Sequence, residues 1–250
     1  MNNHINRIST GIPGLDTRLD GGYPQGESFL VTGTQGTGKT IFGLHFLEKA
    51  CSNNKRCVLI ATEEMPYNLV KQANMFGFDL MGHIESGLLQ INRVYDQRTN
   101  YVRNKTGKMY DPTKREIGLM DLLDYIPAST DVAIIDNIGV FTLEMTPREL
   151  RDKLDTMIQI LAERNCTALF IMDDATHEIT HNIADYSVCG SINLMMKDNP
   201  ENLQIERFIK IIKMRRTCIP MKLMKFNITP KGINLENPLQ PLYCPNVYNL

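Results

Sequence analysis

Eight consecutive residues of this chain have the types and spacing of a loop that binds the phosphates of a nucleotide. They read Gly-Thr-Gln-Gly-Thr-Gly-Lys-Thr from Gly33 to Thr40, which satisfies the pattern G-x-x-x-x-G-K-[ST]. The glycines allow the backbone to wrap so that successive N–H groups point at phosphate oxygens. In this pattern Lys39 reaches the β- and γ-phosphates and the Thr40 hydroxyl binds Mg²⁺. The loop therefore predicts a bound nucleoside triphosphate with a magnesium ion.

The segments on either side of the loop suit this role. Residues 28–32 form a short apolar run that is typical of a buried parallel strand. Apolar residues then recur from Ile41 to Ala50 as they do in a helix packed on a sheet, and the N-terminal end of a helix favours an anion. The residues expected to bind nucleotide are Gly33, Thr34, Gln35, Gly36, Thr37, Gly38, Lys39, Thr40 and Ile41.

A phosphate loop also needs carboxylates that bind the metal ion, and several carboxylates follow predicted strands. Asp136 ends the apolar run 132–135 and fits the position that holds the water shell of Mg²⁺. The alternative is that this aspartate caps the end of the strand and has no role in metal binding. The predicted metal-binding residues are Thr40 and Asp136. The dipeptide 173–174, Asp-Asp, ends another apolar run and could either sense the γ-phosphate or begin a loop.

A pair of glutamates, Glu63 and Glu64, follows the apolar run 56–61. The carboxyl ends of parallel strands face the ligand crevice, so these side chains could orient and deprotonate an attacking water. Glutamates before Met65-Pro66 could equally cap the helix that begins there, since its dipole favours a negative charge. Spacing alone leaves both interpretations open.

Composition narrows the class of protein. A chain of 250 residues with 42% hydrophobic residues can bury a large core, and its net charge of −1 gives no general attraction to nucleic acid or anionic membrane. Residues 1–7 open no apolar segment, so we expect no signal peptide, and no stretch reaches the length of a membrane span. The six cysteines show no C-x-x-C pair, and the five histidines do not join them at metal-ligand spacing. We expect a cytoplasmic protein with reduced, mostly buried thiols and without zinc or disulfides.

Strand-like and helix-like segments alternate along most of the chain. Further strands are predicted at 88–91, 132–136 and 167–172, and a helix at 65–76. Thr146-Pro147-Arg148-Glu149 is a capping box with proline at the first helical position. The inner face of the helix that it opens is predicted to hold Leu150, Leu154, Met157, Ile158 and Leu161.

The pattern changes near the C-terminus, where 186–196, 204–213 and 221–229 are predicted to form consecutive antiparallel strands. No repeat or linker divides the chain. We therefore predict a single α/β domain over residues 1–250. It has a mostly parallel central sheet flanked by helices, followed by C-terminal antiparallel strands.

Several segments together resemble one family. Residues 9–16 and 19–26, which lead into the phosphate loop, are similar to the N-terminal segment of KaiC-like ATPases of the RecA superfamily. Residues 61–64 resemble the family's acidic pair, 134–137 its magnesium-site strand and 212–215 its Lys-x-Arg segment. Residues 227–233 resemble its closing strand and turn, so the likeness covers about residues 7–235.

The resemblance implies a RecA-like core, ATP as the nucleotide and assembly into rings, commonly hexamers, with nucleotide between neighbouring subunits. It assigns the catalytic glutamate to Glu63 or Glu64, beside Lys39. It also implies that Lys213 and Arg215 reach the γ-phosphate of the adjacent subunit, where a cation offsets charge that builds on the γ-oxygens. Without the resemblance, these two cations would be ordinary charges on an edge strand.

The chain departs from the family pattern in three places. Arg216 stands where the family usually has glycine, which adds bulk and charge at the expected subunit contact. Gln35 replaces the usual proline at a loop position that contributes only backbone. Some relatives phosphorylate themselves on adjacent serine and threonine, but residues 180–185 lack that pair and leave only Thr180. Hydrolysis is therefore favoured over autokinase activity.

Residues 93–115 combine seven lysines and arginines with Tyr95, Tyr101 and Tyr110. Such a segment could bind nucleic acid, bind a protein partner or remain solvated. The function expected is Mg²⁺-dependent ATP hydrolysis by a homo-oligomeric switch or signalling ATPase. The alternatives are a recombinase-like DNA-binding ATPase and a nucleotide-dependent scaffold with little hydrolysis. The absence of an Asn-Lys-x-Asp guanine motif agrees with ATP over GTP.

Overall fold

The computed structural model describes residues 5–94, 117–174, 177–201 and 203–236. Within them a nine-stranded sheet has the order β11-β10-β9-β8-β3-β7-β6-β4-β5. The strands are β3 (Ser28–Gly33), β4 (Cys57–Ala61), β5 (Leu89–Arg93), β6 (Val132–Asp136), β7 (Thr167–Asp173), β8 (Gly190–Asn199), β9 (Gln204–Met214), β10 (Met224–Thr229) and β11 (Gly232–Leu235). A separate small sheet pairs β1 (Arg7–Ile8) with β2 (Tyr23–Pro24).

The sheet is parallel from β5 to β8 and antiparallel from β8 to β11. The prediction of a mostly parallel α/β sheet with C-terminal antiparallel strands is thus confirmed. Strands buried on both faces lack polar alternation, which is why β4, β6 and β7 read as continuous apolar runs.

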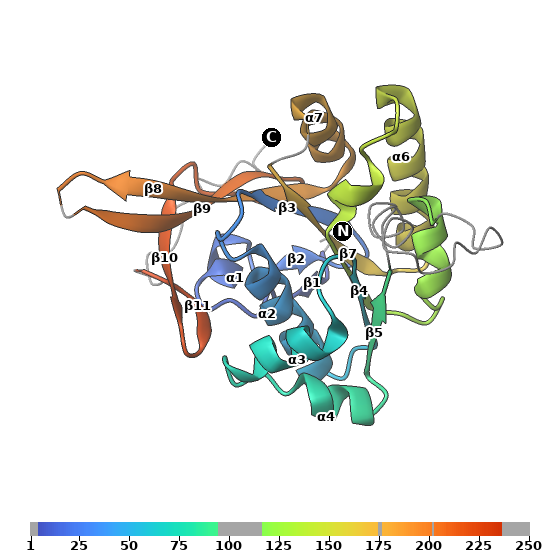
Figure 1. Ribbon diagram of the computed structural model, residues 1–250, viewed down its shortest axis with the longest axis horizontal. Coiled ribbons are helices and arrows are strands. Elements are labelled where there is room, and N and C mark those ends of the chain that lie inside the picture. The colour runs from blue at the N-terminus through green and yellow to red at the C-terminus, as the bar shows by residue number, and fades with distance from the viewer. Residues whose placement is uncertain (1–4, 95–116, 175–176, 202, 237–250) are drawn as a thin grey trace, which may run out of the picture.

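Helices cover both faces of the sheet (Figure 1). One face carries α1 (Leu15–Arg18), α2 (Lys39–Ser52), α3 (Pro66–Asn74) and α4 (Leu80–Glu85), and the other carries α6 (Pro147–Glu163) and α7 (Glu178–Ser187). Two short 3₁₀ turns, η1 (Met120–Tyr125) and η2 (Ile138–Phe141), belong to the second layer. Side chains of β6 alternate between the layers, since Ile134 packs with α2 while Ile135 packs with α6. In the described residues, none of the helices has the length and apolar character to span a membrane.

The helix predicted after residue 146 forms as expected. The Thr146 side chain accepts the backbone N–H of Glu149, and the Glu149 carboxylate accepts the backbone N–H of Thr146. Each end of this pair therefore satisfies an N–H group that the first helical turn leaves without a partner. Of the predicted inner face, Leu150, Leu154, Met157 and Leu161 are buried, and Ile158 is partly buried against the same core.

The strand predicted at 186–196 is wrong at its start. Residues 186–187 close α7, and β8 begins only at Gly190. A short apolar run does not distinguish the end of a helix from the start of a strand, which explains the error. β8 also lies parallel to β3 as far as Leu194 before it continues with β9 alone, and this long hairpin projects from the body (Figure 1).

The expectation that the chain has no disulfide is also wrong. Cys51, Cys57, Cys166 and Cys189 are free and buried, as predicted for reduced thiols, but Cys218 is disulfide-bonded. Pairing depends on how closely two Cβ atoms approach in the fold, and cysteine spacing in the sequence does not determine that approach.

Candidate functional site

The phosphate loop connects the carboxyl end of β3 to the first turn of α2. Gly36 and Gly38 have φ angles of 82° and 104°, in the left-handed region that glycine adopts without strain. At Gly33 an added Cβ would lie 2.4 Å from the backbone oxygen of Leu194, so only glycine fits between β3 and β8. The Thr37 hydroxyl donates to the Thr34 carbonyl at 2.8 Å and closes the loop on itself. These constraints explain why the sequence has glycine at these three positions.

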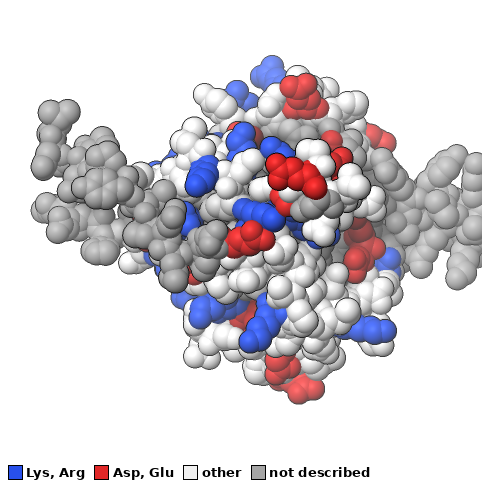
Figure 2. All heavy atoms as spheres, turned by 90° about the vertical axis from the view of Figure 1, so that its left-hand side faces the viewer, with Lys and Arg blue, Asp and Glu red and all other residues white. Residues whose placement is uncertain are grey.

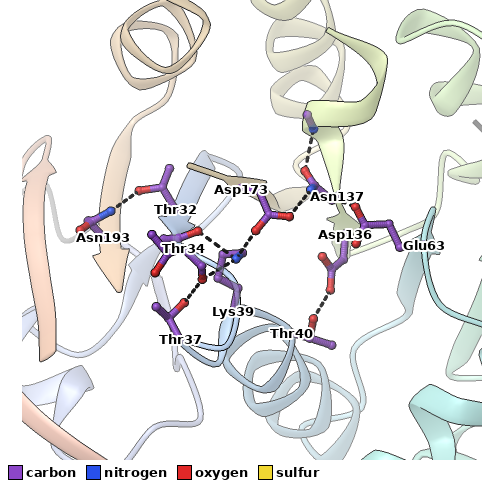
Figure 3. A network of polar contacts seen from close by, with 12 residues as sticks. Thr32, Thr34, Thr37, Lys39, Thr40, Glu63, Asp136, Asn137, Asp173 and Asn193 are labelled. Atoms are coloured by element: carbon purple, nitrogen blue, oxygen red, sulfur yellow. Dashed lines mark hydrogen bonds and ion pairs between the residues drawn. The ribbon is translucent and has the colours of Figure 1, made fainter. Parts of the chain in front are cut away.

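The lysine of the loop is almost fully buried, at 9% exposure, and its ammonium group is fully engaged. Lys39 Nζ donates to the carbonyl oxygens of Gly33 at 2.9 Å and Thr34 at 3.0 Å. It also forms an ion pair with the carboxylate of Asp173 at the end of β7 (Figure 3). An ammonium group has three N–H donors, so these three acceptors use all of them.

The two predicted metal ligands contact each other. Thr40 Oγ1, in the first turn of α2, donates to Asp136 Oδ2, at the end of β6, at 2.7 Å (Figure 3). Burial raises the pKa of Asp136 to about 6, against the Thr40 hydrogen bond and the charge of Lys39, while Glu63 and Asp173 raise it further. A bound cation would relieve this cost, and hydroxyl and carboxylate oxygens are the ligands Mg²⁺ prefers. The residues present therefore fit a magnesium ion held with nucleotide phosphates.

The acidic pair lies at the same place. Glu63 and Glu64 follow β4, which is the neighbour of β6 in the sheet. They line a small pocket of about 40 Å³, whose remaining lining residues are Thr40, Ala61, Leu69 and Asp136. The N-cap residue of α3, Met65, has no side-chain cap hydrogen bond, and the first turn of that helix holds no acidic residue. The geometry therefore favours the interpretation that both glutamates face the site over the alternative that they cap α3.

Sequence reasoning missed the connecting role of Asn137, which is 4% exposed. Its Oδ1 accepts the backbone N–H of Gly139 at 2.8 Å, so its amide nitrogen faces the site. That nitrogen donates to Asp173 Oδ2 at 3.0 Å and to Glu63 Oε1 at 3.4 Å (Figure 3). Its position directly after Asp136 is the only signal of this role in the sequence, because its contacts with Glu63 and Asp173 depend on β6 lying between β4 and β7. The sequence left the dipeptide 173–174 open between a γ-phosphate sensor and the start of a loop, and the contact of Asp173 with Lys39 depends on the strand order.

The two predicted trans residues lie away from this chain's own loop. β9 runs antiparallel to β8, so Lys213 pairs with Ser191, which pairs with Leu30 three residues before Gly33. Lys213 donates to the carbonyl oxygens of Asp185 and Tyr186, and Arg215 donates to that of Tyr186 at 3.1 Å. Burial lowers the pKa of Lys213. Both cations therefore lie toward the amino ends of the parallel strands, opposite the end that carries the loop.

Arg216 adopts a backbone conformation that favours glycine. Its φ angle is 56°, in the left-handed region that few residues other than glycine adopt. Its guanidinium folds back to an ion pair with Glu27 and a contact with Cys189 Sγ at 3.7 Å. The side chain is therefore held by its own chain.

The remaining predicted sites have different outcomes. The basic segment 93–115 lies outside the described residues except for Arg93 and Val94. Thr180 is buried in α7.

On the face that carries the β8–β9 hairpin, basic and acidic side chains are interspersed among the described residues (Figure 2). That face therefore offers no broad basic surface in the described part of the chain.

Comparisons with known proteins identify the family of this chain. A family model described as "ATPase: KaiC" matches residues 8–240. A UPF0273 protein of Methanopyrus kandleri is 30% identical over 239 residues, which covers 93% of this chain and 92% of that protein. The circadian clock protein KaiC2 of Synechocystis is 45% identical over 96 residues, 38% of this chain and 16% of that protein.

A solved structure shares the fold. The crystal structure of a KaiC-like protein from Pyrococcus horikoshii superposes with a TM-score of 0.74 at 26% identity, covering 93% of this chain and all of that one. The strand order, the glycine loop and the family match over residues 8–240 lead to the same assignment. The chain belongs to the KaiC ATPase family and has its RecA-like fold.

Proposed function

We propose that this protein binds ATP with Mg²⁺ and hydrolyses it as a homo-oligomeric switch. The observation that carries the proposal is the contact of Thr40 Oγ1 with Asp136 Oδ2 at 2.7 Å, directly beside the buried Lys39. Lys39 and Thr40 open α2 and Asp136 ends β6, so the start of one helix and the end of one strand bring these residues together. A site that holds a metal–phosphate pair accounts for all three.

Each residue has a task that its position allows. The backbone N–H groups of the loop and Lys39 hold the phosphates, and Thr40 and Asp136 hold Mg²⁺. When bound, the ion neutralises charge on the phosphate oxygens. Glu63 or Glu64, which line the pocket beside Asp136, orient the attacking water and accept its proton. Water then attacks the γ-phosphorus, the bond to the β,γ-bridging oxygen breaks, and ADP and phosphate leave.

Assembly of several copies would complete the site. Lys213 and Arg215 lie at the opposite end of the sheet from the loop of their own chain. We therefore infer that they serve the γ-phosphate of a neighbouring subunit, in a ring that is a hexamer. Each chain contributes one cytoplasmic ATPase domain, and nucleotide state alters how the subunits pack. A protein partner would bind one of these packing arrangements in preference to the other.

Two measurements test the proposal. Wild-type protein should hydrolyse ATP slowly and only with Mg²⁺, and Lys39→Ala should lose this activity. Equal turnover in the two proteins would rule the proposal out. The particle mass in solution should rise when ATP and Mg²⁺ are added, whereas a mass of one chain under all conditions would exclude the ring.

The rival functions predict different results. A scaffold with little hydrolysis would keep partner binding in Glu63→Gln and lose it in Lys39→Ala. A DNA-binding ATPase would show DNA-stimulated turnover and binding that weakens steeply with salt. An autokinase would transfer label from ATP to Thr180, which is buried in the described structure. Hydrolysis is the function that the exposed Glu63 and Glu64 beside Asp136 favour.

A further inference from the structure

A continuous chain of polar contacts links the phosphate-binding lysine to the candidate catalytic glutamate. It runs from Lys39 to Asp173, from Asp173 to Asn137 and from Asn137 to Glu63 (Figure 3). The four residues come from α2, β7, the residue after β6 and the residues after β4, so the strand order brings them together. The hydrolysis scheme above gives Asp173 and Asn137 no task.

The Asp173 carboxylate binds the same ammonium group of Lys39 that a phosphate would bind. Of the three acceptors of Lys39 Nζ, two are carbonyl oxygens of the loop itself and the third is the Asp173 carboxylate. With every ammonium hydrogen engaged, a phosphate oxygen can bind Lys39 only by replacing one acceptor. The acceptor with a full negative charge is the one that competes most directly with a phosphate anion.

The other carboxylate oxygen of Asp173 is connected to Glu63 through the side chain of Asn137. Asn137 is oriented by the Gly139 N–H, so its two amide hydrogens are directed at Asp173 and Glu63. The amide nitrogen lies nearer Asp173, at 3.0 Å, than Glu63, at 3.4 Å. The Asn137 amide is thus shared between two carboxylates. The net charge at Asp173 determines how strongly the Asp173 carboxylate attracts that amide.

We propose that Asp173 is a positioning residue that couples phosphate binding at Lys39 to the hydrogen bonding of Glu63. The coupling passes through the side-chain amide of Asn137. Before nucleotide binds, Lys39 neutralises Asp173, and the Asn137 amide donates to both Asp173 and Glu63. When Lys39 moves to the phosphate, Asp173 loses its cation and draws the Asn137 amide, and Glu63 is released to accept a hydrogen bond from water. The inference rests on the proposed ATPase function and adds its control step.

The chain offers a matched pair of variants for the test. Asp173→Asn removes the charge that competes for Lys39, and Asp174→Asn removes a charge from the adjacent, exposed residue. Both are isosteric and change the net charge equally. Calorimetry with Mg²⁺ and a non-hydrolysable ATP analogue should show about tenfold tighter binding by Asp173→Asn, whereas Asp174→Asn should stay within about twofold of wild type. Equal shifts in the two variants would overturn the proposal, because they would reflect net charge alone.

Turnover at saturating ATP tests the link to Glu63. Asp173→Asn should lower kcat about tenfold or more while it also lowers KM, since Asn137 then no longer releases Glu63. Asn137→Ser removes the shared amide, and its hydroxyl can still accept the Gly139 N–H. Adding Asn137→Ser to Asp173→Asn should therefore restore most of the lost kcat. A double variant as slow as Asp173→Asn, or slower, would contradict the link.

Failure of the proposed function has a different signature. If wild type bound no nucleotide, or if Lys39→Ala bound the analogue as well as wild type, the ATPase proposal itself would fail. If wild type bound and hydrolysed ATP while the two aspartate variants behaved alike, only the role of Asp173 would be overturned.

Discussion

His45 makes the stability of this fold depend on pH in a way that can be calculated. It lies on α2, and its Nε2 accepts the backbone N–H of Ile233, at the start of β11, at 2.7 Å. Nε2 is therefore unprotonated, and Nδ1 carries the proton and donates to the Gly11 carbonyl at 3.2 Å. The ring is 4% exposed and packs edge-on against Phe78. The neutral ring thus ties the N-terminal segment and the closing hairpin to the helix of the phosphate loop.

Burial lowers the pKa of His45 from 6.5 to about 4, against the hydrogen bond to Gly11. A pKa that is lower by about 2.5 in the folded state corresponds to about 3.5 kcal/mol of stability, of which about 3 kcal/mol is lost by about pH 4. Because the pKa is lower in the folded state, the unfolded chain takes up the proton first as the pH falls. The contribution is complete above the unfolded pKa of about 6.5, declines as the pH falls to about 4, and changes no further below that.

Urea unfolding of wild type and His45→Gln between about pH 7.5 and about pH 4 measures this loss. The glutamine carbonyl oxygen can accept the Ile233 N–H but does not titrate, and all other titrating groups are common to both proteins. Wild type should lose about 3 kcal/mol more than the variant over this range. Parallel stability curves for the two proteins would refute the reasoning.

Three further predictions follow from other contacts. Thr146→Ala breaks the capping box of α6 and should lower the free energy of unfolding by about 1 kcal/mol, measured in urea, with no change in m-value; an unchanged stability would contradict the role of this cap. Asp136→Asn should weaken Mg²⁺-dependent nucleotide binding about tenfold or more in calorimetry, and an unaltered magnesium dependence would exclude it as a ligand. Lys39→Ala and Lys213→Ala should each be inactive alone and regain turnover when mixed, because a mixed ring contains intact shared sites; mixtures that stay inactive would argue against action in trans.

Much of the site was predictable because its parts are local in sequence. The phosphate loop is one continuous segment, and Asp136 ends an apolar run that is typical of a buried strand. Parallel strands place their carboxyl ends at one edge of the sheet, so a site role for Glu63 beside Asp136 was one of two interpretations that the sequence left open.

The contacts that depend on strand order could not be predicted in the same way. Asp173 reaches Lys39 because β7 lies between β3 and β6, and nothing in the local pattern specifies that order. The positive φ of Arg216 and the disulfide of Cys218 also depend on tertiary approach. The start of β8 was misplaced because Tyr186 and Ser187 have no side-chain pattern that separates a helix end from a strand.

The central claim is that the loop at residues 33–40 binds a nucleoside triphosphate together with Mg²⁺ through Lys39. Calorimetric titration of the full chain with a magnesium-bound, non-hydrolysable ATP analogue tests it most directly. Wild type should give a saturable heat with a Kd in the micromolar range, about 8 kcal/mol of binding free energy, and Lys39→Ala should bind at least about a hundredfold more weakly. No heat with wild type, or equal affinity in the two proteins, would contradict the account.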